Sequence, residues 1–144
     1  MQHAGPHART ISRSFRLASS IVDALQRRAR ERGESANALA ERLIDEGLRR
    51  DEHPLITFRD GAAGRRAAIV GTRLDVWQVI DTLRASSNSV AETAAYFEIP
   101  EPWVQAAVRY YVAHPEDVDE FAERVKAAAE RERELWERQQ TMLG

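Results

Sequence analysis

The sequence predicts a mainly α-helical protein with short β segments, and three observations lead to this fold class. Apolar residues recur at three- and four-residue spacing over residues 19–51 and again from Val76 to the C-terminus, which is typical of amphipathic helices. Pro54 interrupts the chain between these two parts. The β-prone runs are few and short, covering residues 10–17, 55–59 and 65–70.

The first β-prone run alternates between an apolar and a polar face, because successive side chains of a strand point to opposite sides. One face carries Ile11, Phe15 and Leu17, and the other carries Thr10, Ser12, Ser14 and Arg16. A lone strand cannot satisfy its own backbone groups, and no matching strand lies nearby in the sequence. We therefore expect it to pair with the same strand of a second copy. The alternative is a helical hairpin preceded by a frayed strand.

Two helices follow this strand, separated by Gly33. The first is expected to start at Ser19 or Ser20, where Ser20 and Asp23 have capping-box spacing, and to end at the glycine. The second is expected to be capped by Ser35. Its apolar stripe is expected to form a dimer core together with Phe15 and Leu17, and consists of Leu39, Leu43, Ile44 and Leu48.

Strand, helix, glycine turn and helix over residues 10–51 resemble the ribbon-helix-helix family of DNA-binding proteins, such as the Arc, MetJ and CopG repressors. The resemblance implies a dimer whose two-stranded ribbon enters the DNA major groove. It assigns base contacts to Ser12, Ser14 and Arg16. It assigns a backbone-phosphate contact to the start of the second helix, at Ser35, Ala36 and Asn37. Arg13 departs from the family pattern, because it occupies an inward position that is usually apolar.

Residues 1–9 have no periodicity, and we expect a disordered arm in which Arg9 adds a phosphate contact. Residues 51–54 are expected to form a linker, with His53 as a loop residue.

A second domain is expected over residues 55–115. Two β-prone runs flank the glycine-rich stretch 60–64, which predicts a hairpin. Three short helices should follow: Val76 to Ala85, a helix capped by Ser89 with Glu92 at the capping-box position, and Glu101 to Ala113. The third helix is expected to bury Val104, Ala107, Val108 and Tyr111. Trp77, Trp103 and Tyr110 suit either a core or an interface.

This order of a hairpin and three helices is winged-helix-like. The segments GTRLDVW and VAETAAYFEIPEPWVQAAVRYYVAHPEDV are similar to a domain of unknown function, a match that covers about residues 55–119. That family resembles VapB-type antitoxins, whose toxins are PIN-type ribonucleases. The third helix would expose Glu101, Gln105 and Arg109, a weak electrostatic match to phosphate, so protein contact or dimerisation is favoured over DNA binding for this domain.

A long terminal helix is expected over residues 116–144, starting beside Pro115. Its apolar stripe and arginines are candidates for binding the toxin, because aromatic anchors dominate many interfaces and a cation can reach a carboxylate-rich active site. The alternative is that this helix braces its own domain or the dimer. The candidate toxin-binding residues are Phe121, Val125, Arg131, Arg133, Leu135, Trp136 and Arg138.

Charge is unevenly distributed along the chain. Residues 1–50 carry ten arginines against six acids, a net +4, whereas residues 116–144 carry five Lys and Arg against nine acids, a net −4. This polarity indicates a DNA-facing front and an acidic rear. There is no cysteine, no signal-peptide core and no apolar run that could span a membrane, so we expect a cytoplasmic protein.

Catalytic and metal-binding patterns are missing from the sequence: there is no Ser/His/Asp grouping, no His-x-x-x-His pair and no acid cluster with metal-ligand spacing. We therefore expect no enzymatic activity, no cofactor, no metal and no small-molecule substrate.

The sequence thus supports the hypothesis of an antitoxin and DNA-binding autorepressor that acts as a homodimer or higher even oligomer. One alternative is a stand-alone ribbon-helix-helix transcriptional regulator whose second domain mediates oligomerisation or protein contacts. Another is a structural interaction protein that does not use the ribbon to bind DNA.

Overall fold

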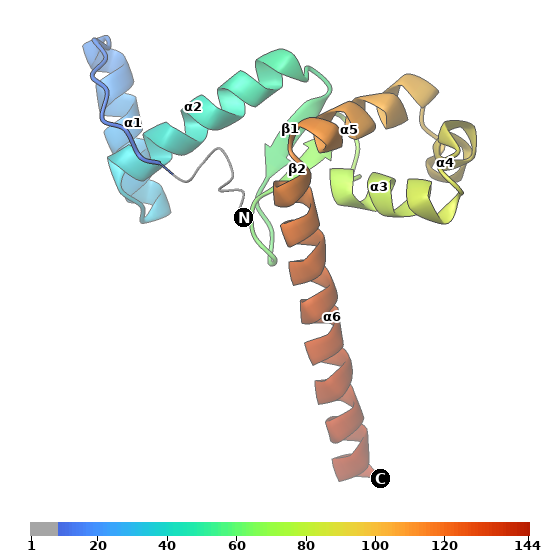
Figure 1. Ribbon diagram of the computed structural model, residues 1–144. Helices are drawn as coiled ribbons and strands as arrows, with labels where there is room; N and C mark the ends of the chain where they lie inside the picture. Colours follow the sequence, from blue (N-terminus) through green and yellow to red (C-terminus); the bar gives the residue numbers. More distant parts are fainter. Residues whose placement is uncertain (1–8) are drawn as a thin grey trace. The chain divides into compact units, whose positions relative to one another are not determined.

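The computed structural model describes residues 9–144, which form six helices and a two-stranded antiparallel sheet (Figure 1). The expected fold class, mainly α with short β, is confirmed at this level. The expected arm at residues 1–9 lies outside the described residues, apart from Arg9. The elements are α1 (Ser19–Arg32), α2 (Ala36–Glu52), β1 (Ile56–Arg59), β2 (Arg66–Ile69), α3 (Val76–Ala85), α4 (Val90–Phe97), α5 (Glu101–Ala113) and α6 (Pro115–Leu143).

The chain divides into two compact units, the first ending at Ile44 and the second covering Asp45–Gly144. In the first unit, α1 begins directly after Ala18, which has extended backbone angles and no capping side chain. The expected capping box of Ser20 and Asp23 is therefore wrong: a capping residue must precede the first turn, and Ser20 already lies inside it. Gly33 ends α1 as expected, at φ 66°.

The start of α2 is as the sequence predicts. The Ser35 hydroxyl accepts a hydrogen bond from the backbone N–H of Ala38 at 3.1 Å. This contact satisfies one of the amide groups that a helix leaves without an internal partner.

The second unit begins with the C-terminal turns of α2 and a β-hairpin, in which Ile56 faces Ile69 and Arg59 faces Arg66. The turn between the strands is closed by a hydrogen bond from the Gly64 N–H to the Gly61 carbonyl at 2.9 Å, and Gly64 has φ 112°. Few residues other than glycine adopt such a backbone, which explains the glycine-rich sequence of this turn.

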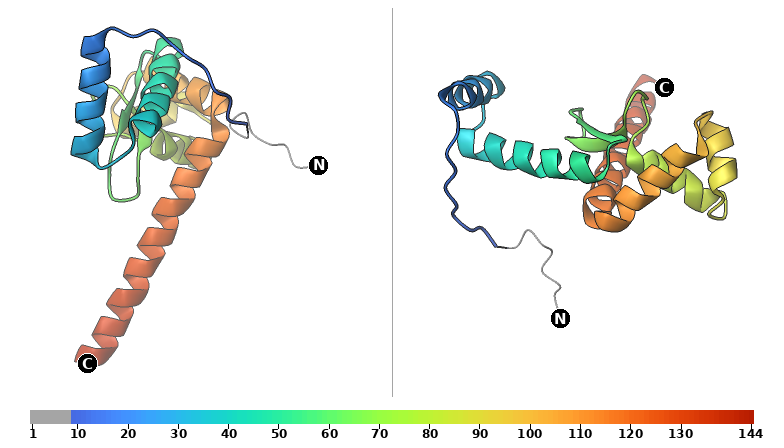
Figure 2. Two further views of the ribbon diagram at one scale, coloured as in Figure 1. Left: turned by 90° about the vertical axis from the view of Figure 1, so that its left-hand side faces the viewer. Right: turned by 90° about the horizontal axis from the view of Figure 1, so that it is seen from above.

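Helices α3, α5 and α6 contact the hairpin, and α4 packs on α3 and α5 (Figure 2). The start of α4 is capped as expected, with the Ser89 hydroxyl accepting from the Glu92 N–H. The start of α3 has a capping box of Asp75 and Gln78 that the sequence analysis did not predict, in which the Gln78 Oε1 accepts from the Asp75 backbone N–H at 2.9 Å. The core of the unit consists of Ile56, Ile69, Val76, Val79, Ile80, Leu83, Ala94, Val104, Ala107, Tyr110 and Val118.

Two details of the second unit differ from the sequence-based expectations. Helix α2 continues to Glu52, so the linker expected over residues 51–54 is shorter, and His53 is buried instead of lying in an open loop. In α5, Tyr110 is fully buried while Tyr111 is half-buried. A tyrosine can be buried completely when its hydroxyl finds a partner, and Arg49 supplies that partner here.

Helix α6 changes character along its length. Val118 and Phe121 are buried in the second unit, Val125 and Ala128 are half-buried, and every residue from Ala129 onward is exposed. The ribbon extends away from the hairpin and α3–α5 over this exposed part (Figures 1 and 2). None of the helices within residues 9–144 combines the length and the apolar character needed to cross a membrane.

Candidate functional site

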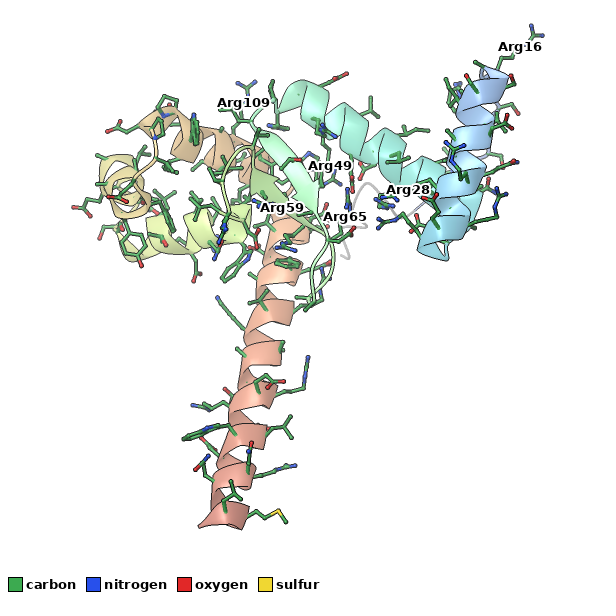
Figure 3. The ribbon with its side chains drawn as sticks, turned by 180° about the vertical axis from the view of Figure 1, so that it is seen from behind. Arg16, Arg28, Arg49, Arg59, Arg65 and Arg109 are labelled. Atoms are coloured by element: carbon green, nitrogen blue, oxygen red, sulfur yellow. The ribbon has the colours of Figure 1, made fainter. Side chains whose placement is uncertain are left out.

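Residues 9–18, which hold the predicted base-contacting side chains, are exposed and form neither helix nor strand in the single chain. Ser12, Ser14 and Arg16 are therefore all accessible, as is Arg9. Arg16 extends into open space beyond the start of α1 (Figure 3). Pairing of this segment with a second copy stays a prediction, because a strand that needs a symmetry mate has no partner in one chain.

The first unit leaves most of its apolar side chains in solvent. Within its described residues, the buried side chains are Ala29 and Leu39, at 3% and 1% exposure. Leu48, on the part of α2 that belongs to the second unit, is also exposed. We call the exposed apolar side chains of the first unit the N-terminal apolar set: Ile11, Phe15, Leu17, Ile21, Leu43 and Ile44, which are 48–77% exposed.

The start of α2 offers free backbone amides at the predicted phosphate-contacting residues. Ser35 precedes the helix, Ala36 and Asn37 open it, and its first turn contains no acidic residue. Because the first amides of a helix lack internal acceptors and carry the positive end of its dipole, they attract anions.

An acidic residue beside this helix start is neutralised by two arginines. The Glu34 carboxylate accepts from Arg42 at 3.0 Å and from Arg32 at 3.5 Å. The hydrogen bond from Arg42 is the main cause that lowers the pKa of Glu34. The carboxylate is thus paired instead of being left as an open negative charge next to the amides.

A buried arginine in the second unit, which the sequence-based reasoning missed, joins three helices. The Arg49 side chain on α2 donates to the Tyr110 hydroxyl at 2.9 Å and to Asp117 at 2.5 Å, at the start of α6. It also donates to Asp45 at 3.0 Å, one helical turn earlier. Burial opposes the positive charge of Arg49, but the hydrogen bonds to Asp117 and Tyr110 outweigh burial and raise its pKa.

A second ion pair fixes the same end of α2 to the hairpin turn (Figure 3). Arg65 donates to both oxygens of Glu46, at 2.5 and 2.6 Å, which is the bidentate geometry of a strong arginine–carboxylate pair. The only sequence signal for these contacts is the four-residue spacing of Asp45 and Arg49, because the other partners lie 19 to 68 residues away.

The Tyr110 ring, which accepts from this arginine through its hydroxyl, packs with two histidine rings. The centroid of Tyr110 lies 5.3 Å from that of His53 and 4.9 Å from that of His114, and the two histidine centroids are 5.9 Å apart. The Nε2 atoms of both histidines are buried and have no hydrogen-bond partner among residues 9–144. Within the same residues, no group of three or more His, Cys, Asp or Glu side chains is arranged to hold a metal ion. We call Arg49 and these three rings the joint, because their contacts link α2, α5 and the start of α6.

A pocket of about 280 Å³ lies beside this joint, between residues 52–55 and α5. Its lining includes Glu52, His53, Gln105 and Arg109. The pocket includes none of the residues predicted to contact DNA or toxin.

The predicted toxin-binding residues on α6 fall into two groups. Phe121 is 5% exposed, and the Arg124 guanidinium lies 5.4 Å from its ring centroid. Phe121 is therefore already packed within its own chain. Leu135 and Trp136 are 56% and 60% exposed, whereas Val125 is half-buried. Arg133 pairs with Glu130 at 2.5 Å. Arg131 and Arg138 are exposed.

The ring cluster predicts a pH dependence of stability. Burial, followed by the charge of Arg49, lowers the pKa of His114 below 6.5, against the opposing charge of Asp117; His53 lowers it further and Asp45 raises it. The unfolded chain then binds a proton on His114 at a higher pH than the folded chain does. This contribution to the free energy of unfolding is fully present above about pH 6.5 and declines as the pH falls from there toward the lowered folded-state pKa.

Replacing His114 with Phe keeps a ring in place but removes the titration. We expect the free energy of unfolding of His114→Phe, measured by urea denaturation, to fall less than that of wild type between about pH 7.5 and pH 5.5. An equal decline in both proteins would contradict the assignment.

Comparison of the chain with protein-family models, with curated proteins and with solved structures finds no match.

Proposed function

We propose that this protein is a dimeric ribbon-helix-helix repressor that binds its own operator and also serves as the antitoxin of a PIN-type ribonuclease. The observation that carries the proposal is the N-terminal apolar set. Six large apolar side chains are exposed in a unit whose described residues bury only Ala29 and Leu39. The polar face of the same predicted strand carries Ser12, Ser14 and Arg16, whose side chains can form hydrogen bonds with DNA bases.

A second copy of the chain is the partner that we propose to cover this apolar set. Full burial of an exposed side chain of this size contributes roughly 1.5–3 kcal/mol. The six are 48–77% exposed, so covering the rest of their surface still offers a driving force for association. Residues 10–17 belong to no helix or strand within residues 9–144, and an antiparallel mate would both cover the apolar set and supply hydrogen-bond partners for the backbone of this segment.

The DNA-contacting face of such a dimer consists of the polar side of the ribbon and the start of α2. Ser12 and Ser14 can donate to or accept from base edges, and Arg16 can bind guanine through two hydrogen bonds. Arg9 and the free amides near Ser35, Ala36 and Asn37 face phosphate. The net +4 of residues 1–50 favours this assignment over an acidic or neutral partner.

Toxin binding is assigned to the exposed part of α6. Leu135 and Trp136 are apolar anchors that the chain's own fold leaves in solvent, and Arg131 and Arg138 are cations beside them. Phe121 and Val125 serve instead to attach the helix to the second unit. The winged-helix-like hairpin and α3–α5 then act as the support from which α6 extends.

The second candidate function is a stand-alone ribbon-helix-helix regulator without a toxin. The observation that favours it is the net −4 of residues 116–144, because an acidic helix is repelled by a carboxylate-rich active site. Co-purification with the product of the adjacent gene distinguishes the two functions.

Charge placed in the apolar set should break the dimer. We expect light scattering to give twice the chain mass of 16.3 kDa for the wild type and the single-chain mass for Phe15→Glu, because a carboxylate would be buried without a partner. Tyr96→Glu is the control: Tyr96 is 72% exposed on α4, comparable with 66% for Phe15, but lies outside the apolar set. A dimeric Phe15→Glu would rule out this dimer core.

Loss of the base-reading arginine should weaken operator binding. For Arg16→Ala we expect a loss of about 1–3 kcal/mol in binding to DNA from upstream of the gene, the usual contribution of a bidentate base contact. Ser12→Ala and Ser14→Ala should lose less, since neutral hydrogen bonds contribute less net free energy. Arg109→Ala removes the same charge from α5 and should bind like the wild type at fixed salt. Unchanged binding by Arg16→Ala would refute the assignment of Arg16 to the DNA-facing side of the strand.

Removing the exposed part of α6 should separate DNA binding from toxin inhibition. Truncation after Pro115 would strip Val118 and Phe121 from the core, so the informative cut lies after Ala127, beyond both buried side chains. We expect the shortened chain to bind operator DNA normally and to lose inhibition of the neighbouring ribonuclease. Full inhibition by the shortened chain would end this assignment.

A further inference from the structure

The exposed part of α6 is built from a sequence repeat. Residues 123–129 read ERVKAAA, residues 130–136 read ERERELW and residues 137–143 read ERQQTML. Each seven-residue block begins with Glu-Arg, and the last two residues of each block are apolar. A strict period of seven is the pattern of a helix that winds around another helix as a left-handed coiled coil.

The repeat continues a seam that is already in use at the start of the helix. Val118, Phe121, Val125 and Ala128 follow one another at alternating three- and four-residue steps, and they are the buried and half-buried residues of that face. The same steps lead on through Glu132, Leu135, Gln139 and Met142. The seam therefore leaves the chain's own fold at Ala128 and continues for roughly 22 Å, at 1.5 Å per residue, with its side chains in solvent.

One flank of this seam is apolar and the other is positive. The seventh residue of each block widens the apolar surface with Ala129, Trp136 and Leu143, of which Trp136 and Leu143 are 60% and 73% exposed. The second residue of each block lines the other flank and forms what we call the arginine ridge: Arg124, Arg131 and Arg138. Arg124 is used within the fold, since it donates to the Ala63 carbonyl at 3.2 Å, whereas Arg131 and Arg138 are exposed.

These charges disfavour a second copy of the same helix as the occupant. In a parallel pair, seam residues face their own counterparts, which places Glu132 against Glu132. In an antiparallel pair, the two arginine ridges face each other. Either arrangement brings like charges together beside an apolar seam, where repulsion is weakly screened.

We propose that residues 128–143 of α6 form one helix of a heteromeric coiled coil, whose partner is an amphipathic helix with carboxylates flanking an apolar seam. This deepens the proposed function, since it rests on α6 being the partner-binding segment, and it assigns a helical, acid-flanked element to that partner. Leu135 and Met142 are the apolar residues of the seam, in which they alternate with Glu132 and Gln139. Trp136 and Leu143 widen the apolar surface, and Arg131 and Arg138 pair with the carboxylates.

Two synthetic peptides of identical apolar sequence test this proposal. Both consist of heptads with leucine at the two seam positions; one has glutamate at both flanking positions and the other has lysine. We expect the full chain to bind the glutamate peptide about fivefold to tenfold more tightly than the lysine peptide at low salt, and this preference to shrink as salt rises.

The charge-reversed chain Arg131→Glu/Arg138→Glu is the matched variant. It should reverse the preference and bind the lysine peptide more tightly, a gain that a misfolded protein would not show. Leu135→Lys should bind neither peptide. Equal binding of both peptides by the wild type, or binding of neither, would overturn the proposal. So would a smaller number of chains per oligomer for the chain cut after Ala127 than for the intact chain, because α6 would then pair with its own copy.

Failure of this test and failure of the proposed function are distinguishable. A chain that ignores both peptides can still inhibit the ribonuclease through another surface, and the cut after Ala127 reports on inhibition directly. A chain that prefers the glutamate peptide but shows no effect of the cut on the ribonuclease has a different acid-flanked partner.

Discussion

The second unit depends on a charge placed inside it. Arg49 is 6% exposed, and a buried guanidinium without partners would be strongly destabilising. Its partners come from separate elements: Tyr110 from α5, Asp117 from α6 and Asp45 from its own helix. Each of these elements must be in place for the charge to be satisfied, so the arginine specifies one arrangement of the three helices more than it adds net stability. The Arg65–Glu46 pair does the same for the hairpin turn.

This joint explains why α6 starts where it does. Pro115 favours the first turn of a helix, and Asp117 places an acid near the positive end of its dipole while accepting from Arg49. With its first turns fixed in this way, α6 directs its later heptads away from the core. A helix held at one end can present a long apolar seam to a partner at little further cost in conformational entropy.

The two units differ in how many apolar side chains they bury. The second unit has a continuous core from the hairpin through α3, α4, α5 and the start of α6. The first unit, with Ala29 and Leu39 buried among its described residues, holds far too little apolar contact for stability by itself. Its exposed apolar set is the feature around which the proposed dimer is built, and residues 9–18 carry three members of that set, Ile11, Phe15 and Leu17, together with the side chains proposed to read DNA. Association and recognition would then both depend on this segment.

Local sequence by itself determined the helices and the hairpin of this protein. Glycine at positions 33 and 64 ends a helix and closes a turn because positive φ suits glycine, and Ser35 and Ser89 mark helix starts because their hydroxyls accept free amides. Spacing of apolar residues located α3, α5 and the buried start of α6. The proposed DNA- and toxin-contacting residues were likewise read from the sequence, as positions on a strand or helix face, and their roles remain proposals.

Only the tertiary structure decided which polar groups lie inside and where α6 becomes free. Tyr110 lies 61 residues after Arg49 in the chain, and the local sequence around Arg49, His53 and Tyr110 resembles that of exposed residues. Nothing in spacing or composition therefore indicates that Tyr110 meets the other two. Apolar residues recur along one face of α6 from Val118 to Met142, interrupted by Glu132 and Gln139, yet their burial ends near Ala128, because there the hairpin and α3 no longer lie alongside the helix. Burial of a polar side chain depends on a distant partner, and exposure of an apolar one depends on where packing stops; both are properties of the assembled fold.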